Sequence, residues 1–234
     1  VSGATRFAFE LRSLPGEDED VAPGLEIGLG PLGEVTSEGV FVQYTDATTD
    51  IAEGTQVSVG TLDFDFSKID RGTIAFGLTG FNANILDFVS LSGDLGFQMQ
   101  TLADGTSEIV AVGENVSAAL EVTDEIFIRL NDADFGLVSG ATRFAFELRS
   151  ERPDDADSAP GLEIGLGPLG EVTADGVFVQ YTNATTDIAA GTQVSVGSLN
   201  YSFSAIERGT IAFGLVGFNA NILDFVSLSG DVAF

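Results

Sequence analysis

The chain has 234 residues, of which 44% are hydrophobic, and its net charge of −27 comes from 36 acidic and 9 basic side chains. This apolar content excludes a disordered tail and is enough for a sizeable core. The negative charge disfavours nucleic acid and anionic membranes as partners. Because the chain has no Cys and no His, disulfides, thiolate or His-ligated zinc sites and a Ser-His-Asp triad are excluded.

An internal repeat sets the expected domain organisation. Residues 1–97 return at 138–234 without a gap, and 78 of these 97 positions are identical. A fixed period indicates one structural unit used repeatedly. We expect a first β repeat unit at 1–137, entered partway through, and a second unit at 138–234 that is a truncated copy of 1–97. We also expect the sequence to be a slice of a longer array, because the counterpart of Val1 is Val138, inside a continuous run.

Apolar and polar residues alternate with a period of two along the whole unit, which predicts β-strands with one buried face. The expected strands lie at 5–12, 25–29, 40–44, 62–66, 74–78 and 126–130. In the first of them, Phe7, Phe9 and Leu11 form the apolar stripe. The small residues opposite such stripes, for example Ala8, suit a second closely packed face.

Breaks between the strands are marked by Gly, Pro and acidic residues. They predict turns at 15–20, 30–33, 37–39, 70–72, 103–106 and 131–134. Ser117–Val122 is the best helical candidate, and it is short. No Pro- or Ser-rich linker separates the two units, which favours units that share a sheet or a core.

The predicted fold is therefore all-β and predominantly antiparallel. We expect a tandem-repeated, elongated structure, a barrel- or sandwich-like meander that is continuous between units. Discrete β-sandwich beads are the alternative.

Paired carboxylates are the remaining route to catalysis, as in glycosidases. Asp63 and Asp65 form an acidic pair on one expected strand, but their counterparts are Asn200 and Ser202. Near-duplicate active sites would not be expected to lose their carboxylates between copies. We therefore expect no catalytic residues and no enzyme activity.

Calcium is the one cofactor that the acidic residues suggest, as a weak site. The candidate ligands are Asn131, Asp132, Asp134, Asp18, Asp20, Asp155 and Asp157. The first three space their oxygens as a calcium turn would, and the other four belong to an acidic loop that both copies keep. A complete calcium loop is missing, and turns are rich in Asp and Asn for backbone reasons alone. Plain turns without a cofactor therefore stay open as the alternative.

Several glycine-rich amphipathic stretches look familiar together. They are VFVQYT at 40–45, FVSLSGDLGF at 88–97, AVGENVSAALE at 111–121 and DADFGLV at 132–138. As a set they resemble the tandem-repeat regions of very large secreted or cell-surface bacterial proteins, which are adhesin-like or fibre-like. The resemblance implies an extracellular or cell-surface location and a structural role in a fibre, filament or surface stalk. It transfers no functional residues.

Two functions follow as expectations. The first is a structural repeat module, whose partners are neighbouring repeat units and other copies of the chain, with no nucleic acid and no membrane insertion. The alternative is an adhesin module that binds a glycan or a surface.

Overall fold

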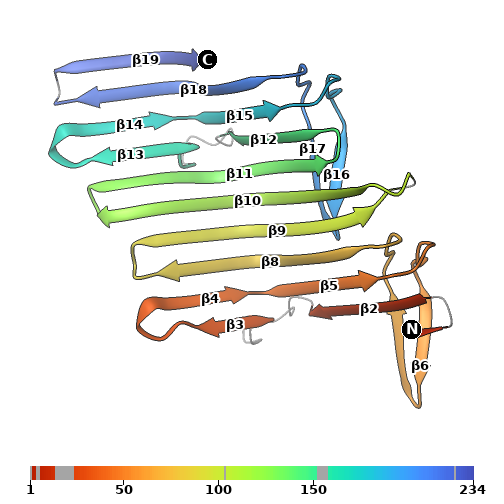
Figure 1. The fold of residues 1–234 in the computed structure, drawn as a ribbon. Helices are drawn as coiled ribbons and strands as arrows, with labels where there is room; N and C mark the ends of the chain where they lie inside the picture. Colours follow the sequence, from red (N-terminus) through yellow and green to blue (C-terminus); the bar gives the residue numbers. More distant parts are fainter. Residues whose placement is uncertain (1, 4–5, 14–23, 103, 152–157, 224) are drawn as a thin grey trace.

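The computed structural model describes residues 2–3, 6–13, 24–102, 104–151, 158–223 and 225–234. One sheet contains 15 strands, and two further two-stranded sheets are hairpins (Figure 1). All of the described strand pairs are antiparallel, which confirms the prediction of an all-β, antiparallel fold. Two short 3-10 turns, η1 (Gly30–Leu32) and η2 (Gly167–Leu169), precede β4 and β14.

The strands of the large sheet are, in chain order, β1 (Ser2–Gly3), β2 (Arg6–Ser13), β3 (Leu25–Gly28), β4 (Gly33–Ser37), β5 (Gly39–Thr45), β8 (Ile74–Ile85), β9 (Val89–Thr101), β10 (Ser107–Thr123), β11 (Ile126–Gly140), β12 (Phe144–Glu151), β13 (Leu162–Leu166), β14 (Gly170–Ala174), β15 (Gly176–Thr182), β18 (Ile211–Ile222) and β19 (Val226–Ala233). The first hairpin consists of β6 (Thr55–Val59) and β7 (Leu62–Phe66), and the second of β16 (Gln193–Val196) and β17 (Leu199–Ser202).

The sheet runs without interruption through both copies. Its long strands β8 to β11 lie side by side, and β12 pairs with one half of β11 while β13 pairs with the other half. β11 itself crosses the predicted unit boundary at residue 137. The two copies therefore do not form discrete sandwich beads. In the described part of the chain, β19 pairs with β18 alone. At the other end of the sheet, β2 pairs with β5 and, at its first two residues, with β1. The two described ends do not pair with each other, so the sheet is open and not closed into a barrel.

Strand registers recur between the two copies. Val42 of β5 pairs with Phe76 of β8, and Val179 of β15 pairs with Phe213 of β18, 137 residues later in both strands. The same residue types thus form the same pairings in each copy.

A line of irregularities crosses the sheet and divides most strand rows into two halves, while β9 and β19 run through it without an extra residue. β8, β10, β11 and β18 each carry a bulge there, and the rows β2/β3, β4/β5, β12/β13 and β14/β15 are interrupted at the same place. A bulge places one extra residue in a strand and often uses a residue in the left-handed region. Asp132 is that residue in β11, with φ of 49°.

Two sequence predictions fail in this region. Residues 131–134 do not form a turn, because they lie inside β11. Ser117–Val122 is not helical, because it lies inside β10 and pairs with β9 and β11 on its two sides. Pairing on both edges overrides the weak local preference of such a segment.

The two faces of the sheet differ in what covers them. One face of the sheet is the side to which the hairpins belong, and we call it the hairpin face. We call the opposite side the open face. On β2, Ala8 and Glu10 point to the hairpin face and are buried, whereas Phe7, Phe9 and Leu11 on the open face are 44%, 44% and 47% exposed. The expected burial of the apolar stripe is therefore wrong for β2. The packed face is the one with small residues, because these let a second layer approach closely.

Candidate functional site

The second hairpin packs against strands that belong mainly to the first copy. Val194, Val196, Leu199 and Tyr201 of this hairpin are all buried. Beneath them lies a surface that we call the hairpin seat. It consists of Gly96 on β9, Val110 and Val112 on β10, and Gly136 and Val138 on β11. Figure 1 shows that β16 and β17 run across these strands and not along them.

Two glycines give the seat its shape. A Cβ atom at Gly136 would lie 2.3 Å from the ring of Tyr201, and one at Gly96 would lie 2.9 Å from Cβ of Val196. Real Cβ atoms do not approach other carbons so closely, because the van der Waals contact distance is about 3.5–4.0 Å. The hairpin can therefore reach the sheet only where these positions have no side chain.

The tip of the hairpin extends the contact farther into the first copy. Gly197, in the turn between β16 and β17, faces Phe41 of β5 so closely that a Cβ atom there would lie 2.6 Å from the Phe41 ring. Ala75 of β8 belongs to the same apolar cluster. The hairpin of one copy thus spans β5, β8, β9, β10 and β11 of the sheet.

A buried carboxylate anchors the base of the hairpin. Glu147 on β12 is fully buried and accepts hydrogen bonds from the Gln180 side-chain amide at 3.0 Å, from the Ser204 backbone N–H at 2.8 Å and from the Ser204 hydroxyl. A buried carboxylate is tolerated when several donors satisfy it. The three bonds join β12, β15 and Ser204, which lies two residues beyond the end of β17.

Arg149 and Tyr201 complete this anchor. Nε of Arg149 lies 3.9 Å from the Glu147 carboxylate and donates a 3.0 Å hydrogen bond to the Tyr201 hydroxyl. Nη2 of Arg149 donates to the Ser202 carbonyl at 2.9 Å. Burial, and next the negative charge of Glu147, raise the pKa of Tyr201 above its ordinary value of 10.0, so this hydroxyl stays neutral at physiological pH.

The first hairpin has the same anchor. Glu10 accepts hydrogen bonds from Gln43 at 3.1 Å, from the Ser67 backbone N–H at 2.9 Å and from the Ser67 hydroxyl, and Arg12 donates to the Asp65 carbonyl at 2.7 Å. The Glu, Arg, Gln and Ser of the anchor are thus identical in the two copies, whereas Phe64 stands in the first copy where the second has Tyr201.

Beyond its anchor, the first hairpin has no seat among the described residues. Val59 and Leu62 are 72% and 75% exposed, whereas their counterparts Val196 and Leu199 are 0% and 3% exposed. Figure 1 shows the hairpin projecting past the β2 edge of the sheet. The same apolar residues are therefore buried in one copy and exposed in the other.

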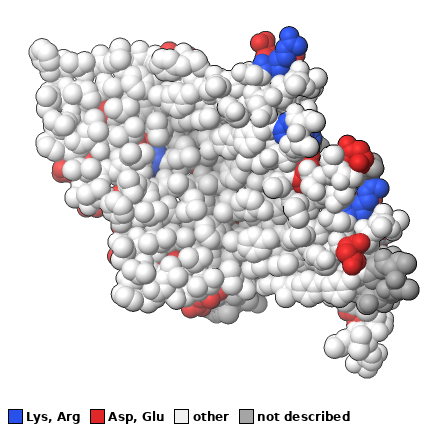
Figure 2. All heavy atoms as spheres, viewed as in Figure 1, with Lys and Arg blue, Asp and Glu red and all other residues white. Residues whose placement is uncertain are grey.

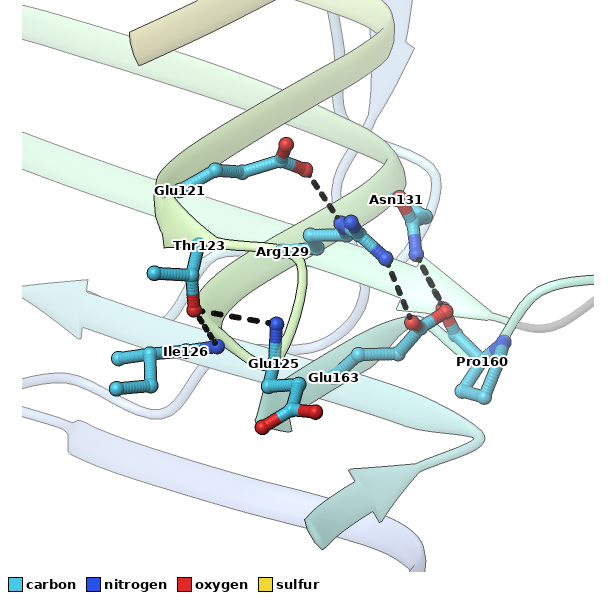
Figure 3. A network of polar contacts seen from close by, with 8 residues as sticks. All are labelled: Glu121, Thr123, Glu125, Ile126, Arg129, Asn131, Pro160 and Glu163. Carbon is cyan, nitrogen blue, oxygen red and sulfur yellow. Dashed lines mark hydrogen bonds and ion pairs between the residues drawn. The ribbon is translucent and has the colours of Figure 1, made fainter. Parts of the chain in front are cut away.

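A second contact holds the two copies together at the opposite half of β11 (Figure 3). Arg129 on β11 lies 2.6 Å from the carboxylate of Glu121 on β10 and 3.7 Å from that of Glu163 on β13. The Asn131 side-chain amide donates to the Pro160 carbonyl at 2.8 Å and to Glu163 at 3.3 Å. These contacts attach β13 of the second copy to β11.

The predicted calcium ligands are only partly described. Asp18, Asp20, Asp155 and Asp157 lie outside the described residues. Asp132 is exposed, and its backbone N–H donates to the Ser117 hydroxyl at 3.1 Å. Within the described ranges no group of three or more Asp, Glu, His or Cys side chains is placed to hold a metal ion.

Asp134 has a structural contact that the sequence analysis missed. Its carboxylate accepts the Asn115 backbone N–H at 2.9 Å, at the bulge of β10. Asp94 accepts Gly80 N–H at 2.6 Å in the same way, and Asp231 accepts Gly217 N–H at 2.8 Å. Each Asp satisfies a backbone donor that the bulge removes from the strand ladder.

The roles of the seat glycines and of the anchor residues were likewise not predicted from the sequence. The available signal for the anchor was that Glu10, Arg12, Gln43 and Ser67 all keep their identity in the second copy, although exposed acidic residues nearby change. A charged residue at the centre of an alternating apolar strand is the kind of position that needs a buried partner.

Among the described residues, no helix combines the length and apolar character that a membrane crossing requires. Comparison of the chain with protein-family models, with curated proteins and with solved structures finds no match.

Proposed function

We propose that this chain is a structural repeat module of an extracellular fibre, filament or surface stalk, in which β units stack end to end through a shared sheet and interlocking hairpins. The observation that carries the proposal is the contrast between the two hairpins. The second is buried on strands of the preceding copy, and the first, with nearly the same sequence, presents its apolar residues past the sheet edge.

The backbone at the same edge supports the proposal. In the second copy, β12 pairs along β11 from Phe144 to Ser150. On the corresponding side of β2 in the first copy, β1 pairs with Arg6 and Phe7, and no described strand pairs with residues from Phe9 to Ser13. The edge of a sheet is a template for pairing with another strand. The exposed hairpin and the open β2 edge therefore suit the same neighbour, a unit that offers a strand like β11 and a seat like the one described above.

Such stacking has a defined dimension. One unit of 137 residues contributes six strand rows, namely β2/β3, β4/β5, β8, β9, β10 and β11. At a spacing of about 4.8 Å per strand, the axial repeat is about 29 Å. Electron microscopy of the native material should show filaments of regular diameter with this repeat.

Stability measurements test the same proposal in solution. A fragment of residues 1–137 lacks the second hairpin and the last three residues of β11, so the rest of the apolar seat on β9, β10 and β11 is uncovered. We expect its urea midpoint to lie well below that of the 234-residue chain, because repeat proteins gain much of their stability from contacts between units. Equal midpoints would show that the units are autonomous and would contradict the proposal.

The alternative function, an adhesin module, has one structural observation in its favour. A hollow beside the anchor of the second copy is lined by Arg149, Phe178 and Val216, among others, and combines polar with apolar groups. Saturable binding of a glycan to the 234-residue chain on an array, abolished by Phe178→Ala, would favour this alternative over a purely structural role.

A further inference from the structure

The open face carries rows of apolar side chains that cross the whole sheet. One row, followed through the strand registers, contains Leu11, Val42, Phe76, Phe97, Ala111, Leu137, Phe146, Tyr181 and Ile211. A second row, beyond the bulges, contains Ile85, Val89, Leu120, Ile128, Ile164, Val172, Ala220 and Leu228. Neither row contains a charged residue.

Much of this face is in contact with solvent. Phe97 is 50% exposed, Ile128 is 48% exposed and Phe213 is 39% exposed. Figure 2 looks onto the open face, and Lys, Arg, Asp and Glu are sparse over its strands and gather toward one margin. A soluble monomer rarely exposes a contiguous apolar patch larger than about 300–600 Å².

Area shows how far this face exceeds that limit. About ten strand rows at about 4.8 Å and about 13 residues at about 3.3 Å per residue give a face of roughly 2,000 Å². The accessible surface of the chain is 13735 Å². A compact monomer of the same mass exposes about 10,000 Å². A large apolar area of the open face is therefore exposed. The seated hairpin does not cover it, because this hairpin lies on the opposite face.

We propose that the open face docks against the open face of a second copy of this chain, which forms a two-layer β-sandwich dimer. Two such sheets have matching length and twist, as face-to-face sheet packing about 10 Å apart requires. Burial of roughly 2,000 Å² from each chain lies in the range of obligate homodimers and above the roughly 800 Å² per partner of a standard interface. The anchor charges Glu10, Arg12, Glu147 and Arg149 all lie on or beside the hairpin face, away from the interface.

This inference goes beyond end-to-end stacking and does not depend on it. Stacking joins sheet edges and produces an open-ended series of masses, whereas a two-fold sandwich closes at two chains. The Val59→Glu substitution, on the exposed first hairpin, blocks stacking and leaves the open face unchanged. The dimer is therefore measured in the Val59→Glu background.

Sedimentation equilibrium of that variant should give twice the chain mass of 24.3 kDa at micromolar concentration. Adding Phe97→Glu, at the centre of the open face, should weaken the dimer at least about 30-fold, as truncation of a central aromatic anchor does. A matched change on the hairpin face, Ser90→Glu, should leave the dimer constant within about threefold.

A second readout does not depend on how well Phe97→Glu folds. The chain has no cysteine, so Ile109→Cys on the open face and Ser58→Cys on the exposed hairpin each introduce a single thiol. The maleimide reaction at position 109 should slow at least about tenfold as concentration rises through the dimer constant, and the reaction at 58 should not change. A monomer up to about 100 µM, a thiol at 109 that stays reactive, or a monomer that binds zwitterionic vesicles would each overturn the proposal.

Discussion

Two leucines with nearly the same sequence context provide a sharp test of the buried hairpin. Leu199 is buried against the seat at Gly96, and its counterpart Leu62 is exposed. A buried Leu→Ala change costs 2.7–5.0 kcal/mol, and the glycine seat cannot refill the space, so we expect Leu199→Ala to lower the free energy of unfolding by about 3 kcal/mol. Only a quarter of the Leu62 side chain is covered, so Leu62→Ala should cost about 0.5 kcal/mol, a quarter of the value for full burial.

The assay is urea unfolding of the full chain at about 1 µM, followed by far-UV circular dichroism. With a slope of about 3 kcal/mol per molar urea, the midpoint should fall by about 1 M for Leu199→Ala and by about 0.2 M for Leu62→Ala. Each variant is the control for the other, because the two positions share their local sequence. Equal shifts would mean that the two hairpins have the same environment and would refute the contrast on which the stacking proposal rests.

Three further predictions concern the anchor, the buried tyrosine and calcium. Glu147→Ala should lower the free energy of unfolding, measured by urea denaturation, by about 3 kcal/mol, because Ser204 and Gln180 lose a charged acceptor. Glu10→Ala should lower it by a similar amount. A loss below about 1 kcal/mol would show that these hydrogen bonds do not anchor the hairpin. Burial raises the pKa of Tyr201, so its contribution to stability is complete below pH 10 and is lost as the pH rises further, because the unfolded tyrosine then ionises first. Tyr201→Phe should therefore flatten the fall in the free energy of unfolding above pH 10, and an unchanged fall would contradict this. Adding millimolar calcium to EDTA-treated protein should change Tm equally in the parent and in Asp132→Ala/Asp134→Ala, because the Asp134 carboxylate is engaged with the Asn115 N–H and Asp132 is exposed. A calcium effect that is lost in the double variant would support the predicted site.

Strand content was predictable from sequence because alternation is a local signal. The stripe of Phe7, Phe9 and Leu11 does mark a strand, and the turn at 70–72 does separate the hairpin from β8. Continuity between the units also followed from a local feature, the missing linker. These properties depend on residues close together in the chain.

Which face of the sheet is buried could not be predicted from sequence, because it depends on contacts between residues far apart in the chain. Alternation defines two faces but does not say which one is covered, and the cover of β10 comes from a hairpin about 85 residues away. The glycines at 96 and 136 look like ordinary strand breakers until that hairpin is placed above them. The Asn131–Asp134 segment misled for a related reason. Residues that favour turns also favour bulges, and only the long partners on both sides of β11 decide between them.

The direction of the seated hairpin has a mechanical consequence. A force along the axis of a stack acts on the hydrogen bonds between neighbouring strands. A sheet without a hairpin packed across it would therefore separate at its weakest strand pair. The hairpin of β16 and β17 lies crosswise over β9, β10 and β11, and its base is tied to β12. Separating these strands therefore requires Val196 and Tyr201 to leave their positions over Gly96 and Gly136 in the hairpin seat. The hairpin thus resists separation of several strands at once.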